Sequence, residues 1–205
     1  MSTRGSQQPV SWKARGAKGF SAIELLVAMA VVLIISGIAM PSITTNLRVY
    51  QLNSTASMVA DQLKSSRFDA IRRNTPQTCV IQPSPTGTGY RMFTDTLGNG
   101  TYVNTDHSTS LTGSASLVPV GNVPIAGQLA SAMNVTGTTA ISAIPAPVTL
   151  SFDPRGAVTG NPLINVLYIG YPNNPTWGYR AVVILPSGSV QLWTPNANNS
   201  WTQVN

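Results

Sequence analysis

A single carboxylate, Glu24, stands directly in front of an apolar run. The nineteen residues that follow it, 25–43, contain no charged side chain. A carboxylate moved toward the centre of a bilayer costs about 2.5–3.5 kcal/mol, so it is rare there without a partner. Two interactions are open to Glu24: pairing with a cation, or complementing the positive N-terminal end of a helix, which contributes about 0.3–1 kcal/mol.

The run 25–43 predicts a helix that spans a membrane. At about 1.5 Å per residue it extends roughly 28 Å, close to the hydrocarbon thickness of about 30 Å. Four Lys and Arg residues and no acidic residue lie in 1–19. Positive charge marks the cytoplasmic side of a membrane helix. We therefore expect the chain to start in the cytoplasm and the sequence after the helix to lie outside it.

Three interpretations of this N-terminal segment compete. In the first, the small residues Gly37 and Ala39 mark a signal-peptidase site, and a secreted β-rich binding protein is released that starts near Met40. The second is a plain signal anchor, in which Glu24 has no role. The third accounts for the basic tail, the glycine before the helix and the carboxylate together, and we favour it.

The pattern G-F-S-x-x-E at residues 19–24, with a basic tail before it and a long apolar helix after it, resembles the signal of type IV prepilins and type II secretion pseudopilins. This resemblance implies that a prepilin peptidase of the bacterial inner membrane cleaves between Gly19 and Phe20 and methylates the new amine of Phe20. It also implies that Glu24 neutralises the terminal amine of a neighbouring subunit during assembly. Pro41 matches a proline that often kinks this helix in relatives, where it removes one backbone hydrogen bond and bends or melts the helix locally.

The sequence after the apolar run predicts an α+β fold. Apolar residues at helical spacing continue the helix to about residue 74, where Asn74, Thr75 and Pro76 favour its end. The apolar residues that fall near one face of this continuation are Leu52, Ala56, Val59, Leu63 and Ala70. We therefore expect a leader in 1–19, a transmembrane and filament-core helix in 20–43, an amphipathic continuation in 44–74 and an antiparallel β-rich globular head in 75–205. The predicted strands are 78–82, 90–95, 148–152, 163–171, 179–185 and 190–194, and short strands with long loops are expected in 96–146.

Two further motifs resemble the GspH/FimT family of minor pseudopilins and minor pilins. They are S-S-R-F-D-A-I-R-R-N at residues 65–74 and F-D-P-R-G at residues 152–156. The resemblance implies a structural subunit with a pilin-like fold whose partners are other pilins or pseudopilins. A type IVa major pilin usually closes a C-terminal disulfide loop, which this chain cannot form because Cys79 is its one cysteine. Whether the subunit serves a type II secretion pseudopilus or a type IV pilus stays open.

Residues that could carry out catalysis or bind a metal are sparse. His107 is the one histidine and lies in a polar loop, where adjacency to serine and aspartate is not the geometry of a catalytic triad. Cys79 lies in an apolar strand, which favours a buried thiol over a reactive one. The chain has no ligand set for a metal and no glycine-rich loop for a nucleotide. We expect no enzyme activity, no metal and no cofactor.

Nucleic-acid binding is an alternative, because some FimT-like minor pilins act as DNA receptors in natural transformation. Its candidate residues are Lys64, Arg67, Arg72 and Arg73. At about 100° per residue, Arg73 points away from Lys64, so the four do not share a helix face. Beyond residue 19 the chain has eight basic and six acidic residues, so the formal net charge of +6 falls to +2. So small an excess of positive charge offers little of the phosphate neutralisation on which DNA affinity depends, so we do not favour DNA binding.

Overall fold

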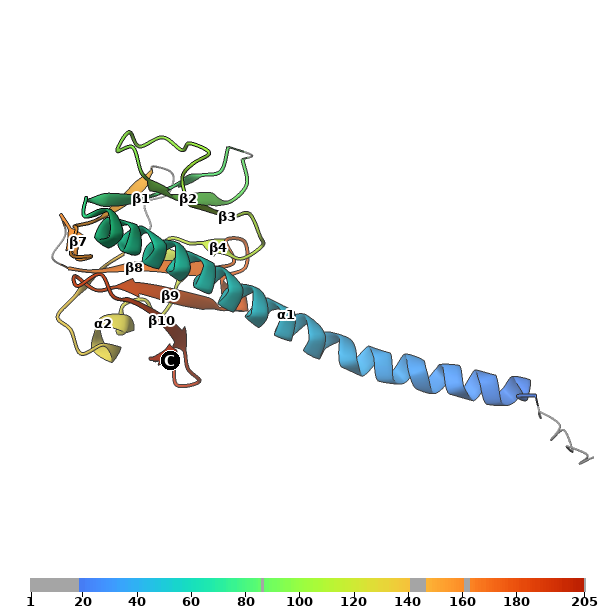
Figure 1. The fold of residues 1–205 in the computed structure, drawn as a ribbon. Helices are drawn as coiled ribbons and strands as arrows, with labels where there is room; N and C mark the ends of the chain where they lie inside the picture. Colours follow the sequence, from blue (N-terminus) through green and yellow to red (C-terminus); the bar gives the residue numbers. More distant parts are fainter. Residues whose placement is uncertain (1–18, 86, 141–146, 161–162, 205) are drawn as a thin grey trace, which may run out of the picture. The chain divides into compact units, whose positions relative to one another are not determined.

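The computed structural model of the protein describes residues 19–85, 87–140, 147–160 and 163–204 (Figure 1). The predicted leader up to residue 18 lies outside these residues, as do positions 141–146 of the predicted loop region. The chain forms two compact units, of which the first ends at Ile43 and the second begins at Thr44. Each unit is described by itself. We call the second one the globular unit.

Helix α1 (Ala22–Arg73) confirms the predicted long helix. It begins after Ser21, whose carbonyl oxygen accepts hydrogen bonds from the N–H groups of Glu24 (3.0 Å) and Leu25 (3.1 Å). The backbone stays helical through position 41. The expected local melting at Pro41 therefore does not occur; its side chain lies outside the described part of the structure.

The end of α1 is set by Asn74, as the sequence predicts. Asn74 adopts a positive φ of 52°, and the Thr75 N–H donates to the Ala70 carbonyl oxygen at 3.3 Å. This left-handed residue followed by a backbone bond to the last turn is a common way to end a helix, and Asn tolerates the conformation. Pro76 follows and cannot continue the helix.

Two sheets form the β-rich part of the globular unit. Sheet A has the order β3-β2-β1-β6-β7, and sheet B has the order β11-β10-β9-β8-β4. All these pairs are antiparallel, as expected; β5 is an exception, since it pairs with β8 in parallel. The strands of sheet A are β1 (Gln77–Pro83), β2 (Tyr90–Asp95), β3 (Ser108–Leu111), β6 (Val148–Phe152) and β7 (Val158–Thr159). Those of sheet B are β4 (Ser116–Leu117), β5 (Thr138–Ala140), β8 (Ile164–Gly170), β9 (Tyr179–Ile184), β10 (Val190–Pro195) and β11 (Trp201–Val204).

The six predicted strands are all present, with ends that differ by at most one residue. The region 96–146 contains the short strands β3, β4 and β5, as expected. It also contains elements that the sequence does not predict, and strand β11 was likewise not predicted. The additional elements are the 3-10 helix η1 (Val120–Asn122) and helix α2 (Gln128–Ala132), and a second 3-10 helix, η2 (Pro175–Trp177), precedes β9.

One face of α1 packs against both sheets within the globular unit (Figure 1). The residues that the sequence places on this face, including Leu52, Val59 and Leu63, are all buried. They share a core with Phe152 of sheet A and Val182 of sheet B. The helical spacing of the apolar residues therefore identified the buried face of α1 correctly.

Sheet B is covered on both faces. Alternate residues of β8 and β9 point to opposite sides: Leu167 and Val182 belong to the core under α1, whereas Tyr168 and Val183 belong to a second core with Leu129 of α2. Continuous apolar strands are typical of sheets buried on both faces. Helix α2 and the loops beside it therefore cover the face of sheet B that α1 leaves open.

Candidate functional site

The predicted cleavage site lies in exposed chain before the helix. Gly19 and Phe20 precede the helix and are exposed, and Phe20 is 81% exposed. No atom lies within 4 Å of the position that a Cβ on Gly19 would take. An exposed peptide bond outside the helix is accessible to a peptidase. Glu24 lies in the first turn of α1, where its carboxylate complements the positive end of the helix.

The N-terminal part of α1 exposes apolar side chains on all sides. Its residues up to Ile43 are exposed wherever their side chains are described, including Leu33 and Ile38. Among the described residues, α1 is a helix that is long and apolar enough to cross a membrane. No part of its most apolar stretch is buried. So continuous an apolar surface marks a site of contact with lipid or another protein.

The two motifs that resemble the GspH/FimT family meet in space. Arg67, in the first motif, donates from Nε to the carbonyl oxygen of Gly156, in the second, at 3.0 Å. The motif F-D-P-R-G forms the turn between β6 and β7, in which Asp153 Oδ1 accepts from the N–H groups of Arg155 and Ala157, each at 2.8 Å. Arg67 therefore joins the end of α1 to this turn.

The turn between β9 and β10 also lies next to Arg67. Gly188, between β9 and β10, has a φ of +76°, and a Cβ there would overlap the carbonyl oxygen of Gly156. Gly156 has a φ of +82°, and a Cβ there would lie 2.7 Å from Cδ1 of Ile71. Both positions favour glycine for conformation, and Gly188 also needs it for space, because its added Cβ would meet backbone atoms. We call Arg67, Gly156 and Gly188 the turn junction.

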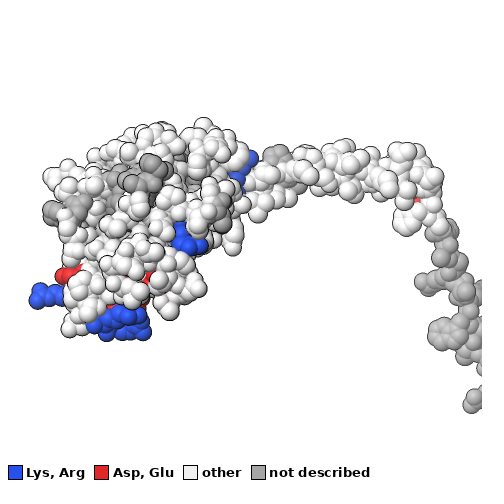
Figure 2. Space-filling view, turned by 90° about the horizontal axis from the view of Figure 1, so that it is seen from above, with Lys and Arg blue, Asp and Glu red and all other residues white. Residues whose placement is uncertain are grey.

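The four candidate DNA-binding cations are not one surface. Arg67 belongs to the turn junction, Lys64 pairs with Asp61 at 3.4 Å, and Arg72 pairs with Asp69 at 2.7 Å. Arg73 has no ion pair within the described residues. On the face shown in Figure 2, the basic side chains of the globular unit gather in separate places, with acidic side chains beside the largest group.

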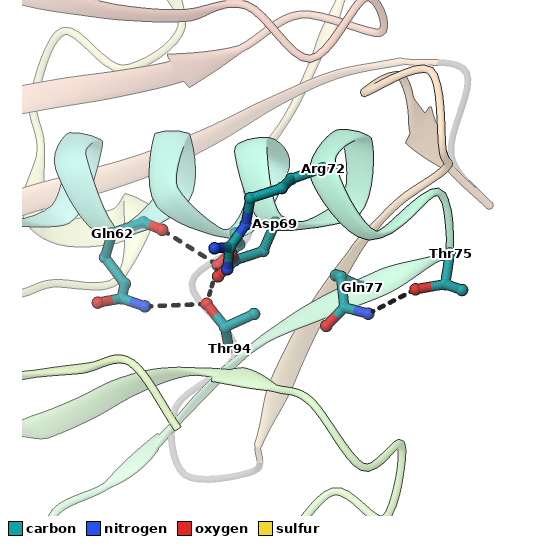
Figure 3. Close-up of polar contacts among 7 residues, drawn as sticks. Gln62, Asp69, Arg72, Thr75, Gln77 and Thr94 are labelled. Carbon is teal, nitrogen blue, oxygen red and sulfur yellow. Dashed lines mark hydrogen bonds and ion pairs between the residues drawn. The ribbon is translucent and has the colours of Figure 1, made fainter. Parts of the chain in front are cut away.

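Buried polar residues connect α1 to sheet A. Gln62 Nε2 donates to the His107 carbonyl oxygen (2.9 Å) and to Thr94 Oγ1 (3.2 Å), and its Oε1 accepts from Thr109 Oγ1 (3.0 Å). Ser66 Oγ lies 2.6 Å from Thr94 Oγ1. Figure 3 shows Gln62 and Thr94 pointing toward each other between the helix and the strands. Because buried polar groups are costly when unpaired, this network specifies one position of α1 on the sheet.

Cys79 and His107 occupy the environments that the sequence predicts. Cys79 is fully buried, and burial raises the pKa of its thiol from 9.0 to about 12. A hydrogen bond with Ser66 has a smaller effect in the opposite direction.

His107 is exposed. The Asp106 carboxylate accepts from Thr96 and Val103, and no hydrogen bond joins it to His107 within the described residues. Those residues also contain no group of three side chains that could hold a metal ion.

The first turns of α1 in the globular unit contact an aromatic pair. The Arg48 guanidinium lies over the ring of Trp177, 3.8 Å from its centroid. Tyr171 meets Trp177 edge to face, with 5.3 Å between the ring centroids, and donates from its hydroxyl to the Arg48 carbonyl oxygen at 3.0 Å. Trp177 remains 39% exposed. These contacts hold α1 against the loop that follows β8.

Arg180 is a residue that the sequence did not single out. It is the second residue of β9, and its Nε donates to Asn53 Oδ1 of α1 at 2.8 Å. The available signal was that Arg180 is the one basic residue in 156–205, a segment that contains no Asp or Glu. A basic residue in such a segment has no acidic residue nearby in the sequence with which to pair.

Comparisons with known proteins yield structural similarity only. No protein-family model matches the chain, and a search of curated proteins finds no match. Among solved structures, the chain is similar to the type IV minor pilin FimU of Pseudomonas aeruginosa in two crystal forms. The first has a TM-score of 0.46 at 16% identity over 70% of this chain and 88% of that chain. The second has a TM-score of 0.43 at 17% identity over 69% of this chain and 91% of that chain.

Proposed function

We propose that the chain is a structural minor pilin or pseudopilin subunit of the GspH/FimT kind, which assembles into a type IV pilus or a type II secretion pseudopilus. The observation that carries the proposal is the order of features at the N-terminus. An exposed Gly19–Phe20 bond precedes a helix with Glu24 in its first turn, and the apolar side chains that follow are exposed.

Each of these features has a role in assembly. A prepilin peptidase removes residues 1–19 and methylates Phe20, so the chain is a substrate of that enzyme. The apolar half of α1 holds the subunit in the bacterial inner membrane, with the globular unit in the periplasm, and then packs among the helices of neighbouring subunits. The same apolar surface suits both places, because lipid and apolar helices each remove it from water.

Glu24 supplies the charge that guides this assembly. Cleavage creates an α-amine at Phe20, and an ammonium group on a neighbouring subunit neutralises a carboxylate that is otherwise costly in an apolar environment. The interaction of Glu24 with its own helix end is compatible with this pairing. It explains neither the glycine at 19 nor the basic tail before it.

The decisive experiment is the intact mass of the mature protein from its host. The expected mass corresponds to a chain that begins with N-methylated Phe20. Gly19→Val is expected to block processing and to leave the full-length precursor in the membrane. Gly16→Val changes another glycine of the same tail and is expected to be processed normally. A mature chain that begins near Met40 would instead indicate a secreted protein and overturn the proposal.

Assembly is tested separately with Glu24→Val. This variant is expected to be cleaved and methylated but to be depleted at least tenfold from the sheared pilus or pseudopilus fraction. Glu24→Asp keeps the charge and is expected to be incorporated. Normal incorporation of the valine variant would contradict the charge pairing and leave the processing proposal intact.

A further inference from the structure

The Arg180 guanidinium is half-buried without an acidic partner. Its Nε donates to Asn53 Oδ1 and its Nη1 donates to the Tyr179 carbonyl oxygen, each at 2.8 Å. Both acceptors are neutral. Burial lowers the pKa of this guanidinium, because the surroundings disfavour its charged form. No carboxylate oxygen lies within 4.0 Å of it in the described part of the chain.

Arginine has five N–H donors, and the described contacts use two of them. The other donors form one side of a planar fork that matches the two oxygens of a carboxylate. A partly desolvated cation without a counterion is unfavourable, whereas a bidentate carboxylate provides both the charge and the acceptors. Arg180 therefore lacks a counterion and acceptors for its remaining N–H donors, and a carboxylate supplies both.

Arg180 lines a groove of about 310 Å³ at the side of α1. Ser57 of α1 and Thr194 of β10 contribute hydroxyl groups to it, and Leu192 of β10 and Val204 of β11 contribute apolar surface. This volume is at the lower limit for small-molecule sites, which are typically about 300–1,000 Å³. It suits a side chain presented on a peptide better than a whole cofactor.

The border of the groove is a free sheet edge. Strand β11 is the last strand of sheet B and, among the described residues, pairs with β10 alone. Its Trp201 is buried in the core beside α2, while Val204 is exposed and faces the groove. No charged side chain follows Arg180 in the sequence, so no acidic residue of β10 or β11 repels or replaces an incoming carboxylate.

We propose that this groove binds an aspartate or glutamate side chain on a segment of a neighbouring subunit in the filament. Arg180 pairs with its carboxylate, Ser57 and Thr194 supply hydroxyl donors, and Leu192 and Val204 contact the stem of the side chain. The charge complementarity selects the occupant, because the described residues that line the groove include the cation Arg180 and no acidic side chain. This inference depends on the proposed function for the identity of the partner.

The test is site-specific photocrosslinking of the full-length protein in its native host. p-Benzoylphenylalanine replaces Thr202, which is exposed on β11 opposite Thr194 and is not among the residues that line the groove. Mass spectrometry identifies the crosslinked peptide. We expect that peptide to come from another subunit and to contain an acidic residue beside the crosslinked position. Arg180→Gln is expected to lower the crosslink yield about tenfold, which corresponds to the loss of one charge-assisted contact.

Arg155→Gln is the matched control, because Arg155 is an exposed arginine of the same unit outside the groove. It is expected to leave the yield unchanged. Replacing the partner's acidic residue with its amide is expected to lower the yield as Arg180→Gln does. That variant leaves this chain unaltered, so misfolding of Arg180→Gln cannot account for the result. Exchanging the two charges, with Arg180→Glu and an arginine in the partner, is expected to restore the crosslink.

Two outcomes would overturn the inference. One is a crosslink that persists at the original yield in Arg180→Gln or forms at a peptide without an acidic residue. The other is the absence of a crosslink in protein that carries methylated Phe20 and is present in the filament fraction. In the second outcome the proposed function stands and the groove is not a subunit contact. A mature chain that begins near Met40 would contradict the proposed function itself.

Discussion

The basic residues near the end of α1 have different roles. Lys64 and Arg72 form pairs with acids three positions earlier on the helix, and their side chains remain accessible. Arg67 contributes instead to tertiary structure, because its partner is the Gly156 carbonyl oxygen 89 positions away. Positive charge in this segment is therefore partly structural, because Arg67 stabilises the turn junction.

This difference predicts unequal effects on stability. Arg67→Ala removes a charge-assisted hydrogen bond and leaves a turn carbonyl without its partner, so we expect the free energy of unfolding to fall by about 1.5–3 kcal/mol. Arg72→Ala removes an exposed helix pair and is expected to cost about 0.5 kcal/mol. Urea unfolding of the full-length protein in detergent micelles, followed by near-UV circular dichroism, measures both. Equal losses would show that the contact with Gly156 does not stabilise the fold.

At the scale of elements, two hairpin turns define where α1 ends on the sheets. The turn between β6 and β7 and the turn between β9 and β10 meet at Arg67, and the Val158 N–H donates to the Pro186 carbonyl oxygen at 2.9 Å. Sheet A and sheet B are therefore joined at the turn junction as well as through the core under α1. Glycine is required there because two backbones and a helix side chain approach one another.

The turn junction predicts a strong dependence on Gly188. Gly188→Ala adds a methyl group that overlaps the Gly156 carbonyl oxygen, in addition to left-handed backbone strain of about 1–2 kcal/mol. We expect a total loss on the order of 4 kcal/mol, as for the most damaging single substitutions. Gly160→Ala is the control, because Gly160 has a φ of +84° and nothing within 4 Å of an added Cβ. It should cost the strain alone in the same unfolding measurement, and a similar cost for both variants would contradict the close packing of the two turns.

At the scale of the whole molecule, charged residues are few, and the basic ones are divided between the N-terminal tail and the globular unit. The tail before Phe20 holds four of the twelve basic residues, and the proposed processing removes them. The globular unit retains eight basic residues against five aspartates. Two of these cations are paired with aspartates, and Arg67 and Arg180 are bonded within the fold. Affinity for DNA depends on neutralising several phosphates at once, which such a surface does poorly.

Residues 45–205 are therefore expected to bind DNA weakly at low salt and not at physiological salt. A gel-shift titration with duplex DNA at both salt concentrations measures this. The triple variant Lys64→Gln, Arg72→Gln, Arg73→Gln tests whether any binding at low salt comes from the end of α1. Retardation at physiological salt that this variant abolishes would establish the alternative function as a DNA receptor.

Local and periodic features of the chain were predictable. Helix α1, its buried face and its end at Asn74 follow from apolar spacing and from residues that stop helices. The six long strands follow from apolar runs between turn residues. Helix α2 was not predicted, because five residues are too few for a periodic pattern to emerge. The apolar residues on both faces of β8 and β9 were the signal that such a cover exists.

The sequence by itself predicted the N-terminal signal and determined the order of the elements, because both depend on neighbouring residues. The tertiary structure decided which polar groups are satisfied, because their partners lie far away along the chain. Arg67 meets Gly156 across 89 positions, and Arg180 meets Asn53 across 127 positions. The same contacts distinguish a bonded arginine from one that still lacks an acidic partner. Such differences depend on burial and distance, which only the folded chain provides.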